Sequence, residues 1–538
     1  MLNLEIHITR LAGPRLVEAY QAGRADALAF YRGSPWELET YRSKVAEIDA
    51  RFDRESRRRL SDLVRPLSPG AHDKLDSIVN GNGLFVTTGQ QPGLFAGPLY
   101  TVYKALTAVQ LARALESALE RPVLPLFWIA SDDHDWEEAN HVHVVDRLNR
   151  LQRIVAPMPE DAPPASMRRR QFGPEIETTL DAFIQALPTT EFAGSLLEQL
   201  RTSYRPGQTV ARAFEELIAG LLSGFDIALV DGGQPALKAA ASDLFERELR
   251  LAGEHEMLLS LRSRALEDAG YHVQVPVLPG ATNVFYEDEL GRERIFRERD
   301  EFVLRRTGRR YPAVALLDAL RADPSRFSAN VALRPVVESA VFPTVAYVGG
   351  PGEVSYFAQL DPLFEAHGIG APVVFPRHSI TLVEAKVRKV LDRFGLDLAD
   401  FSAPFDQLVT RVAREELPAD VTAAIASLRR ALREGYERLT RAALGIDPTL
   451  EGPLRGARNQ TDLRLAAAER RIVSHWKRRH ELEIKRLERA AMNLYPAGEP
   501  QERILNVHQY LVRYGSELLP AIAERMDVGL NVVSGSPR

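Results

Sequence analysis

The stretch LFVTTGQQPGLFAGPLYTVYK, residues 84–104, decides the fold of this chain. Its first five residues, 84–88, are apolar or β-branched and too few for a helix, which predicts a buried parallel strand. Pro98 suits the first position of a helix that is expected at about 99–119. Strand, glycine turn and helix make half of a Rossmann-like unit, and open α/β sheets bind ligands at such a turn.

The turn after this strand combines glycines with amide side chains. Gly93 and Gly97 allow close backbone approach to a ligand, while Gln90 and Gln91 add hydrogen-bond donors and acceptors. The spacing matches neither the dinucleotide motif G-x-G-x-x-G nor the phosphate-binding loop G-x-x-x-x-G-K-[ST]. The turn therefore predicts a ligand site without specifying the ligand, and an ordinary turn with a polar rim is the alternative.

A second apolar run, residues 123–130, predicts a central strand that ends in the polar cluster SDDHDWEE. If the two strands are parallel neighbours, their carboxyl ends bring Asp133, His134 and Asp135 beside the first glycine turn. His134 is then placed to act as a general acid or base, and the adjacent carboxylates are expected to raise its pKa.

Two alternatives remain open for this cluster. His134 could bind a metal together with His141, His143 and the carboxylates, or the cluster could be a solvated strand end without chemistry. No H-E-x-x-H-type spacing places ligands on one face, so we assign no metal ligands.

The order of strand, glycine turn and helix returns later in the chain. Residues 344–348 predict a strand, the run GGPG at 349–352 a turn, and Glu353 the start of a helix. Asn330 and Arg334 precede this unit. The guanidinium of Arg334 is suited to hold a carboxylate or phosphate through two hydrogen bonds, and a surface ion pair is the alternative.

The remaining sequence predicts a parallel-sheet core with additions. Apolar runs at 225–230 and 372–375 supply two more strands, and mixed segments at about 150–220 and 240–325 interrupt the core as insertions. Amphipathic segments at 421–444 and 461–494 predict an antiparallel helical hairpin. We therefore expect an α/β fold in three parts: a Rossmann-like core at 1–385, a helical coiled-coil arm at 386–498, and a helical segment at 499–538 that returns to the core.

Length and composition limit the function. With 538 residues the chain exceeds one ordinary domain, and 45% hydrophobic with 26% charged residues is typical of a globular protein. No apolar run reaches the roughly 20 residues of a membrane span, and no signal-peptide layout begins the chain, so we expect a cytoplasmic protein. The net charge of -5 argues against nucleic-acid binding. The absence of cysteine excludes disulfides, thiolate nucleophiles and cysteine–zinc sites.

Six motifs together make the chain resemble a known enzyme family. In chain order they are GQQPGLFAGPLYTVYK (89–104), PLFWIASDDHD (125–135), RFSANVALRP (326–335), VGGPGEVSY (348–356), FPRHSITLVE (375–384) and PQERILNVHQYLVRYG (500–515). They are similar to those of the bacillithiol biosynthesis cysteine-adding enzymes, the cysteine ligases of that pathway. The insertions and the hairpin match this family in placement more than in sequence.

The resemblance implies a Rossmann-like core with two connecting-peptide insertions, a coiled-coil arm used for homodimerisation, and a relationship to class I nucleotidyl-transferring enzymes. It also implies the reaction, in which cysteine is joined to the amino group of glucosaminyl malate to form bacillithiol, with ATP activating the carboxylate. The chain lacks the paired histidines and the lysine-rich loop of better-known class I enzymes. Adenylate, acyl phosphate and nucleotide-independent routes therefore stay open, as does a metal requirement.

The same analogy assigns roles to the polar residues at the strand ends. Gln91, Asp133 and His134 are the catalytic candidates, which would face the activated acyl group, orient the amine or take its proton. The substrate-binding candidates are the other polar and glycine residues of the motifs: Gln90, Gly93, Gly97, Asp135, Asn330, Arg334, Gly350, Gly352, Glu353, Tyr356, Arg377 and Ser379.

A site for ATP or ADP is expected near the C-terminus. Gln501, Arg503, Asn506 and Tyr510 follow a Pro/Gly break, and the last three recur at helical spacing in a helix expected at about 501–514. One face would then present a cation, an amide and an aromatic ring to phosphate and adenine. The alternative is that these side chains dock the helix onto the base of the hairpin.

Two interpretations from other classes remain. A nucleotide-binding coiled-coil scaffold would need no polar residues at several strand ends, which this sequence has. A class I-like nucleotidyltransferase would act on a different acyl substrate. An oxidoreductase is disfavoured because its G-x-G-x-x-G turn is absent.

Overall fold

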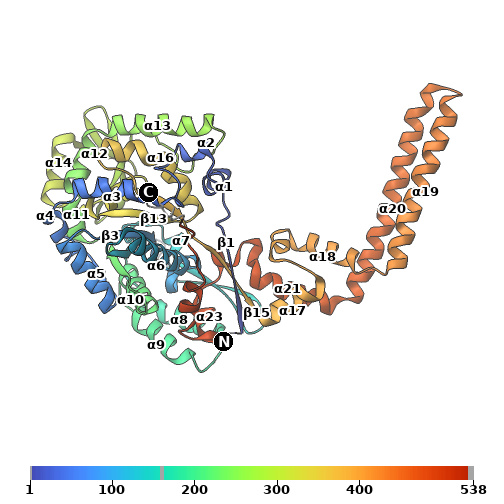
Figure 1. Cartoon of the computed structure of the whole chain (residues 1–538), viewed down its shortest axis with the longest axis horizontal. Helices are drawn as coiled ribbons and strands as arrows, with labels where there is room; N and C mark the ends of the chain where they lie inside the picture. Colours follow the sequence, from blue (N-terminus) through green and yellow to red (C-terminus); the bar gives the residue numbers. More distant parts are fainter. Residues whose placement is uncertain (1–2, 158–162, 531–538) are drawn as a thin grey trace, which may run out of the picture. The chain divides into compact units, whose positions relative to one another are not determined.

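The computed structural model describes residues 3–157 and 163–530. Two compact units make up the chain, and their elements are labelled in Figure 1. The larger unit holds residues 6–381 and the chain from residue 502 on, and the smaller unit holds residues 3–5 and 382–501. Strands β1 (Leu4–Thr9) and β15 (Ser379–Glu384) carry the chain from one unit to the other. No helix in these described ranges is both long and apolar enough to cross a membrane.

Six strands form the central sheet of the larger unit, in the order β14-β13-β3-β4-β7-β2. Five of them run parallel, and the short edge strand β2 pairs antiparallel with β7. All five predicted strands are present, although the run at 225–230 forms a strand only from Ala228. The bounds are β2 Arg65–Pro66, β3 Leu84–Gln90, β4 Val123–Ile129, β7 Ala228–Asp231, β13 Thr344–Gly349 and β14 Val373–Pro376.

Alternate residues of these strands enter two separate apolar cores, so helices cover both faces of the sheet. On β3, Phe85 belongs to one core, while Leu84 and Val86 belong to the other. Burial on both faces is typical of a parallel sheet. The helices that contribute to the two cores include α1 Arg15–Gln21, α3 Leu38–Arg51, α5 Pro69–Asn80, α6 Tyr100–Leu119 and α16 Pro351–Ala366, and the short α2 Ala25–Leu28 and α4 Arg54–Arg58 lie between them in sequence.

The first insertion separates β4 from β7 and starts directly after β4, before the predicted boundary at about 150. Asp135 caps the short helix α7 by accepting the Glu138 N–H at 3.2 Å, so the chain turns into the insertion at once. A β-hairpin and three helices follow. The elements are α7 Trp136–Ala139, β5 His141–Val145, β6 Leu151–Val155, α8 Glu175–Ala186, α9 Ala193–Ser203 and α10 Val210–Leu222.

The second insertion lies between β7 and β13 and extends beyond the predicted end at about 325. Its five-stranded antiparallel sheet has the order β11-β10-β9-β8-β12, and its last strand leads into Asn330. The elements are α11 Pro235–Ala240, α12 Ser242–Arg250, α13 Ala252–Asp268, β8 Ala281–Asp288, β9 Gly291–Glu298, β10 Glu301–Leu304, β11 Arg309–Pro312, α14 Ala313–Ala322, β12 Phe327–Ala329 and α15 Arg334–Val341.

The predicted closing helix at about 501–514 is wrong as a single helix. The chain forms α22 (Gln501–Ile504) and α23 (His508–Tyr514), and between them Leu505 and Asn506 make isolated bridges to His143 and Pro98. These bridges take the backbone out of the helical path, which breaks the helical spacing expected of this segment. A further short helix, α24, spans Leu518–Ala523.

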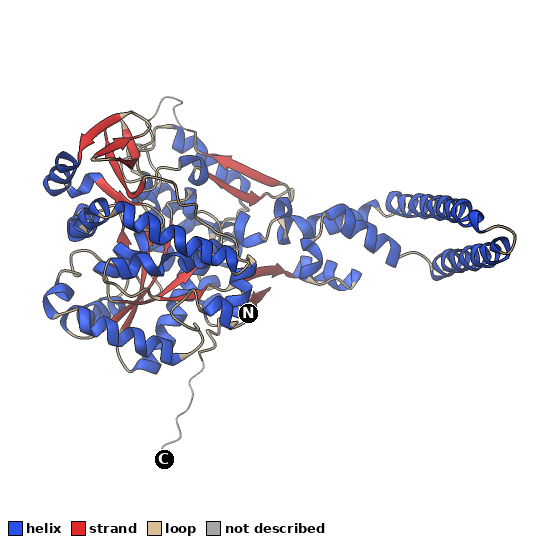
Figure 2. Cartoon of the chain, turned by 90° about the horizontal axis from the view of Figure 1, so that it is seen from above, coloured by secondary structure: helices blue, strands red, loops and turns tan. Residues whose placement is uncertain are grey.

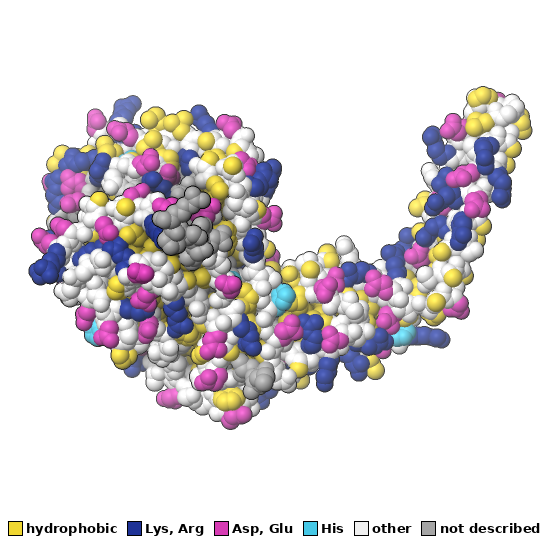
Figure 3. Space-filling model, in the orientation of Figure 1, with side chains coloured by type: hydrophobic (Ala, Val, Ile, Leu, Met, Phe, Trp, Pro, Cys, Tyr) yellow, Lys and Arg dark blue, Asp and Glu magenta, His cyan; other side chains and the backbone are white. Residues whose placement is uncertain are grey.

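Helices dominate the smaller unit (Figure 2). The first predicted hairpin helix is present. The second, predicted at 461–494, is wrong as a single helix: α20 ends at Arg479, and α21 begins at Glu481. α20 begins already at Glu451, because Pro453 lies in the first turn, where its missing N–H costs no hydrogen bond. Leu428, Leu439 and Leu463 of the hairpin are at least half exposed, and Figure 3 shows such apolar side chains among mixed charges. The bounds are α17 Ala385–Phe394, α18 Phe405–Glu415, α19 Ala419–Leu444, α20 Glu451–Arg479 and α21 Glu481–Leu494.

Candidate functional site

A cavity of about 620 Å³ opens at the carboxyl ends of β3, β4 and β13. Because β3 and β4 run parallel, with Gln90 opposite Ile129, the loops that follow them reach the same edge of the sheet. The start of α16 and strands β8 and β9 of the second insertion complete the wall. Gln91 and His134 both line this cavity, as the sequence predicted.

Twelve of the predicted site residues line the cavity, and they come from all the strand ends that the sequence singled out. They are Gln90, Gln91, Asp133, His134, Asn330, Arg334, Gly350, Gly352, Glu353, Tyr356, Arg377 and Arg503.

Four predicted substrate contacts lie elsewhere. Gly93 and Gly97 line a separate pocket of about 90 Å³, because the chain turns away from β3 before it reaches them. Asp135 serves as the cap of α7. Ser379 donates to Glu502 Oε1 at 3.0 Å, so its hydroxyl is used within the protein.

The common face predicted for nucleotide binding does not exist in this fold. The side-chain amide of Gln501 accepts the Leu382 N–H at 2.9 Å and donates to the Leu382 carbonyl at 3.0 Å. Asn506 donates to two backbone carbonyls, and Tyr510 is almost fully buried. Of these four residues, only Arg503 reaches the cavity. The correction follows from the broken helix. Asn506 is bound by the first glycine turn of the core, so the alternative of docking onto the hairpin base does not hold for it either.

Asp133 follows β4 and accepts three hydrogen bonds. Its Oδ1 accepts the N–H groups of His134 at 2.7 Å and of Asp135 at 3.0 Å, and its Oδ2 accepts the side-chain amide of Gln91. Burial raises the pKa of Asp133, but the hydrogen bonds from Asp135 and Gln91 outweigh burial and hold it below its ordinary value. Asp133 is therefore an ionised carboxylate at neutral pH and can hold an ammonium group.

His134 contacts Arg292 of β9. The Nη1 atom of Arg292 lies 3.0 Å from His134 Nδ1, and a guanidinium can only donate, so Nδ1 accepts and the neutral ring carries its proton on Nε2. Burial and the charge of Arg292 lower the pKa of His134, and they outweigh Asp133 and Asp135. The predicted upward shift is therefore wrong. The ring offers a donor at Nε2, which suits orientation of a substrate oxygen.

The buried Lys104 of α6 and the partly buried Glu353 of α16 form an ion pair, with Nζ 2.6 Å from Oε2. Glu353 also accepts the Gly350 N–H at 2.8 Å, so the pair fixes the turn between β13 and α16. Burial lowers the pKa of Lys104. Burial raises the pKa of Glu353, but the opposite effect of Lys104 and the Gly350 N–H is larger. The pKa of Glu353 therefore lies below its ordinary value.

A second ion pair, between Asp132 and Lys238 of α11, lines the same cavity. Burial raises the pKa of Asp132 and lowers that of Lys238. Both shifts disfavour the charged forms, so a proton is exchanged within this pair more easily than between an ordinary carboxylate and an ordinary lysine.

Arg334, the first residue of α15, is partly buried in the cavity wall, and its partner Glu338 is buried, so the pair is not the surface ion pair considered above. Its Nη1 donates to Glu338 Oε2 at 2.8 Å, and its guanidinium carbon lies 5.8 Å from the ring centre of Trp128 and 5.1 Å from that of Tyr347. Burial raises the pKa of Glu338. The guanidinium is thus held rigidly by a carboxylate and aromatic rings.

Arg377 follows β14 and forms a two-pronged pair with Glu502, with hydrogen bonds of 2.9 and 2.8 Å. Its Nε is buried and has no partner in the described part of the chain. A Cβ placed on Gly350 would lie 3.7 Å from this nitrogen, so the Nε–H group lies beside the start of α16. Only this edge of Arg377 is left for a ligand.

The sequence interpretation missed four cations of the cavity wall: Lys104, Lys238, Arg292 and Arg294. Lys104 was detectable, because it lies one helical turn after Tyr100 and a helical side chain leans toward the N-terminal turn. Arg292 contacts His134 across 158 positions of sequence, and Lys238 lies in a segment without a motif. Only the tertiary fold brings these two residues to the site.

A parallel sheet with both faces covered, glycine turns and a charged cavity at the carboxyl ends of its strands defines a Rossmann-like ligand-binding core. Comparison with known families agrees. Residues 2–378 match the N-terminal Rossmann-like domain of bacillithiol biosynthesis BshC, and residues 380–529 match its C-terminal coiled-coil domain. The chain belongs to the BshC family.

Similar proteins are found in several bacteria, and each is named "Putative cysteine ligase BshC". The relative from Salinibacter ruber is 33% identical over 521 residues, which cover 95% of this chain and 94% of the relative. The relative from Koribacter versatilis is 32% identical and covers 95% of both chains. That from Solibacter usitatus is 32% identical, over 93% of this chain and 92% of its own.

Proposed function

We propose that this chain is a ligase that joins the carboxyl group of cysteine to the amino group of glucosaminyl malate, with ATP activating the carboxylate. The names of its relatives support ligation of cysteine. One observation in the structure supports it most: a single cavity holds an ionised carboxylate, a buried proton-carrying pair and a guanidinium edge without a partner. A two-substrate condensation needs these three functions together.

In this proposal Asp133 holds the amine. Its lowered pKa keeps it ionised, so it attracts the ammonium form and places the nitrogen at the carboxyl end of β4. His134 donates from Nε2 to an oxygen of the acyl group, because Arg292 occupies Nδ1. The ammonium must lose a proton before it attacks, and the Asp132–Lys238 pair is the proposed acceptor because its pKa values are shifted toward each other.

ATP supplies the leaving group, either as an acyl adenylate with release of pyrophosphate or as an acyl phosphate with release of ADP. The start of α16 is the proposed phosphate site. Helix N-termini favour anions, and the buried Nε–H of Arg377 adds a donor beside Gly350. Arg503 adds a positive charge to the same cavity.

The test is to incubate the protein with cysteine, glucosaminyl malate and ATP and to identify the products by mass spectrometry. The amide product is expected together with AMP or ADP in equal amount, and the nucleotide formed tells the two activation routes apart. Product formation without nucleotide cleavage would contradict ATP activation. No product with any combination would favour the scaffold, and AMP formation with another carboxylic acid would favour a different acyl substrate.

A matched pair of variants tests the role of Asp133. Asp133→Asn is expected to lower kcat/KM at least 100-fold, because it removes the charge that holds the ammonium. Asp135→Asn is the control: it changes the neighbouring carboxylate, which caps α7 and lies outside the cavity. Equal loss in both variants would show that the local backbone, and not the Asp133 charge, sets the activity.

We also propose that the α19–α20 hairpin pairs with a second copy of the chain. Leu428, Leu439 and Leu463 are 50%, 51% and 65% exposed there, which is unfavourable for apolar side chains that repeat along a helix pair. Leu428→Glu with Leu439→Glu should convert a dimer to a monomer in light scattering. Leu148→Glu, at a still more exposed leucine of the larger unit, should not. A dimer that persists in the double variant would place the contact elsewhere.

A further inference from the structure

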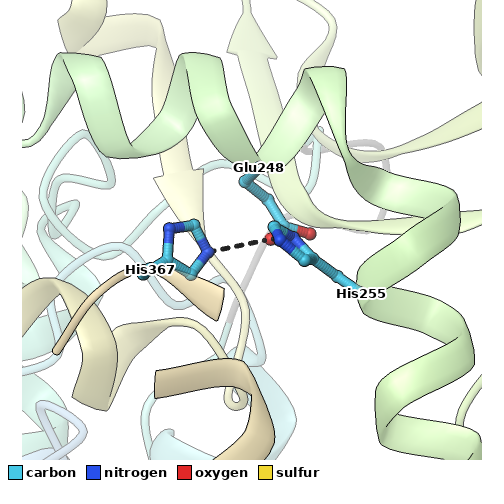
Figure 4. A group of neighbouring side chains, drawn as sticks. All are labelled: Glu248, His255 and His367. Carbon is cyan, nitrogen blue, oxygen red and sulfur yellow. Dashed lines mark hydrogen bonds and ion pairs between the residues drawn. The ribbon is translucent and has the colours of Figure 1, made fainter. Parts of the chain in front are cut away.

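A buried cluster of one carboxylate and two imidazoles lies outside the cavity described above. Glu248 comes from α12, His255 from α13, and His367 caps the C-terminal end of α16. One potential ligand atom from each lies within 4.8 Å of the other two. Figure 4 shows the three side chains pointing toward one another from separate elements.

Both imidazoles contact the same oxygen of Glu248. His255 Nδ1 lies 2.6 Å from Glu248 Oε2, and His367 Nε2 lies 3.3 Å from it. The other oxygen, Oε1, accepts the backbone N–H of Asn283 at 3.2 Å and its side-chain amide at 2.9 Å.

A buried carboxylate in contact with two imidazoles needs a positive partner whenever it is ionised. Glu248 is fully buried, and within the described residues its ion pairs are with these two histidines alone. A buried carboxylate without a cation is costly, so the cluster must hold either an extra proton on an imidazole or a metal ion.

We propose that Glu248, His255 and His367 bind one divalent transition-metal ion, with zinc as the best match. Two imidazole nitrogens and one carboxylate oxygen are ligands that zinc takes, and water can fill its fourth position. Ligand atoms about 2.0–2.2 Å from a tetrahedral zinc lie roughly 3.4 Å apart. The 3.3 Å spacing of His367 Nε2 already fits, and His255 needs to move back by less than about 1 Å.

The metal would also hold one wall of the candidate active site. Asn283, which donates to Glu248, accepts the side-chain amide of Asn330 at 2.8 Å. Asn330 lines the cavity. Loss of the ion would loosen the joined ends of α12, α13 and α16 and, through Asn283, the position of Asn330. This inference does not depend on the proposed reaction.

The first test measures metal content. The full-length protein, purified without chelator or affinity metal, is analysed by plasma mass spectrometry, and about one zinc per chain is expected. His255→Ala and His367→Gln should each lose most of it. His272→Ala, which changes an exposed histidine, should keep it. Equal zinc in the wild type and the two cluster variants would overturn the assignment.

The second test uses the wild-type protein alone, so it does not depend on how well a variant folds. After removal of metal by a chelator, zinc is titrated back against a competing indicator, and one site with a Kd below about 0.1 µM is expected. Cobalt added instead should give the strong visible absorption of a tetrahedral site. No binding stronger than about 10 µM, or cobalt spectra of an octahedral aquo ion, would show that a proton compensates the charge.

Discussion

The chain contains the order of strand, glycine turn and helix twice, and the two copies are built differently. In the first, the chain makes a detour after β3 through a short 3₁₀ turn, Leu94–Ala96, before α6 begins. Phe95, Ala96 and Gly97 all have positive φ angles in this detour. In the second, α16 starts directly after Gly350, whose φ is -78°.

The two turns are also held by different means. Asn506, more than 400 positions away, donates to the carbonyls of Phe95 and Gly97 at 2.8 Å each, so a distant segment holds the first turn. The second turn is held by its own helix, because Glu353 accepts the Gly350 N–H. A repeated sequence pattern therefore predicts the secondary structure of both copies. Gly350 and Gly352 of the second turn line the cavity, whereas Gly93 and Gly97 of the first turn do not.

The largest effect is expected at Lys104 and Glu353, the ion pair that joins α6 of the first copy to α16 of the second. Lys104→Met leaves the partly buried Glu353 without its buried cation and should lower the free energy of unfolding by about 3 kcal/mol or more. Urea unfolding followed by circular dichroism measures this change. Lys74→Met is the control: it removes a more exposed pair with Glu116 and should cost less than about 1 kcal/mol.

Adding Glu353→Gln to Lys104→Met should recover part of the loss, because the uncompensated charge is then removed. An unchanged urea midpoint in the single variant Lys104→Met would show that the stability of the two strand–turn–helix copies does not depend on this ion pair.

The next largest effect is expected for Asn506→Ala, which should cost about 3 kcal/mol. It leaves two buried carbonyls of the first turn and the N–H of His508 without partners. Thermal and urea unfolding both measure it. Asn80→Ala, at an exposed helix end, should change stability by less than about 0.5 kcal/mol. If the two variants are alike, another contact holds the turn.

The five parallel strands of the central sheet were predictable from sequence because they are largely apolar runs, whereas the two-residue edge strand β2, Arg65–Pro66, has no such pattern and was not predicted. Periodicity also located the hairpin, although Pro453 hid the start of α20. The broken C-terminal helix was not predictable: residues 501–514 have a helical pattern, and the break depends on bridges to Pro98 and His143, which are distant in sequence.

The candidate site was predictable to the extent that its residues follow strands. Asp133 and His134 come directly after β4, and parallel pairing brings them to Gln91. The pKa of His134 was not predictable, since Arg292 approaches from another sheet. Burial, which the local sequence does not report, reverses the effect of the neighbouring carboxylates.

A pH effect of about 2 kcal/mol is expected from His508, which supports the first turn by contacting Asn506 Oδ1 at 2.9 Å. Burial lowers the pKa of His508 to about 3, below its ordinary 6.5 in the unfolded chain. The neutral ring thus contributes stability in full above pH 6.5 and loses it as the pH falls toward 3, by about 1.4 kcal/mol per unit.

The measurement compares the unfolding free energy of the wild type with that of His508→Gln at pH 6.5 and 4.5. The wild type should lose about 2 kcal/mol more than the variant over this range. A difference that stays constant with pH would mean that His508 is protonated in the folded protein or that its pKa is not lowered.

The smallest effects should separate the two glycine turns directly. Gly97 has φ 67° and ψ -157°, a conformation that residues other than glycine adopt at a cost of about 1–3 kcal/mol. Gly97→Ala should lower stability by that amount, although the nearest atoms leave room for a methyl group. Gly350→Ala should change stability by less than about 0.5 kcal/mol, because its φ is ordinary and its Cβ would meet Glu353 at 3.4 Å. Ligase activity should show the opposite order, since only the Gly350 methyl group enters the cavity beside Arg377. Urea midpoints and kcat/KM of both variants test these opposite orders of stability and activity. A Gly350→Ala variant that is unstable but active would contradict the position of Gly350 in the cavity wall.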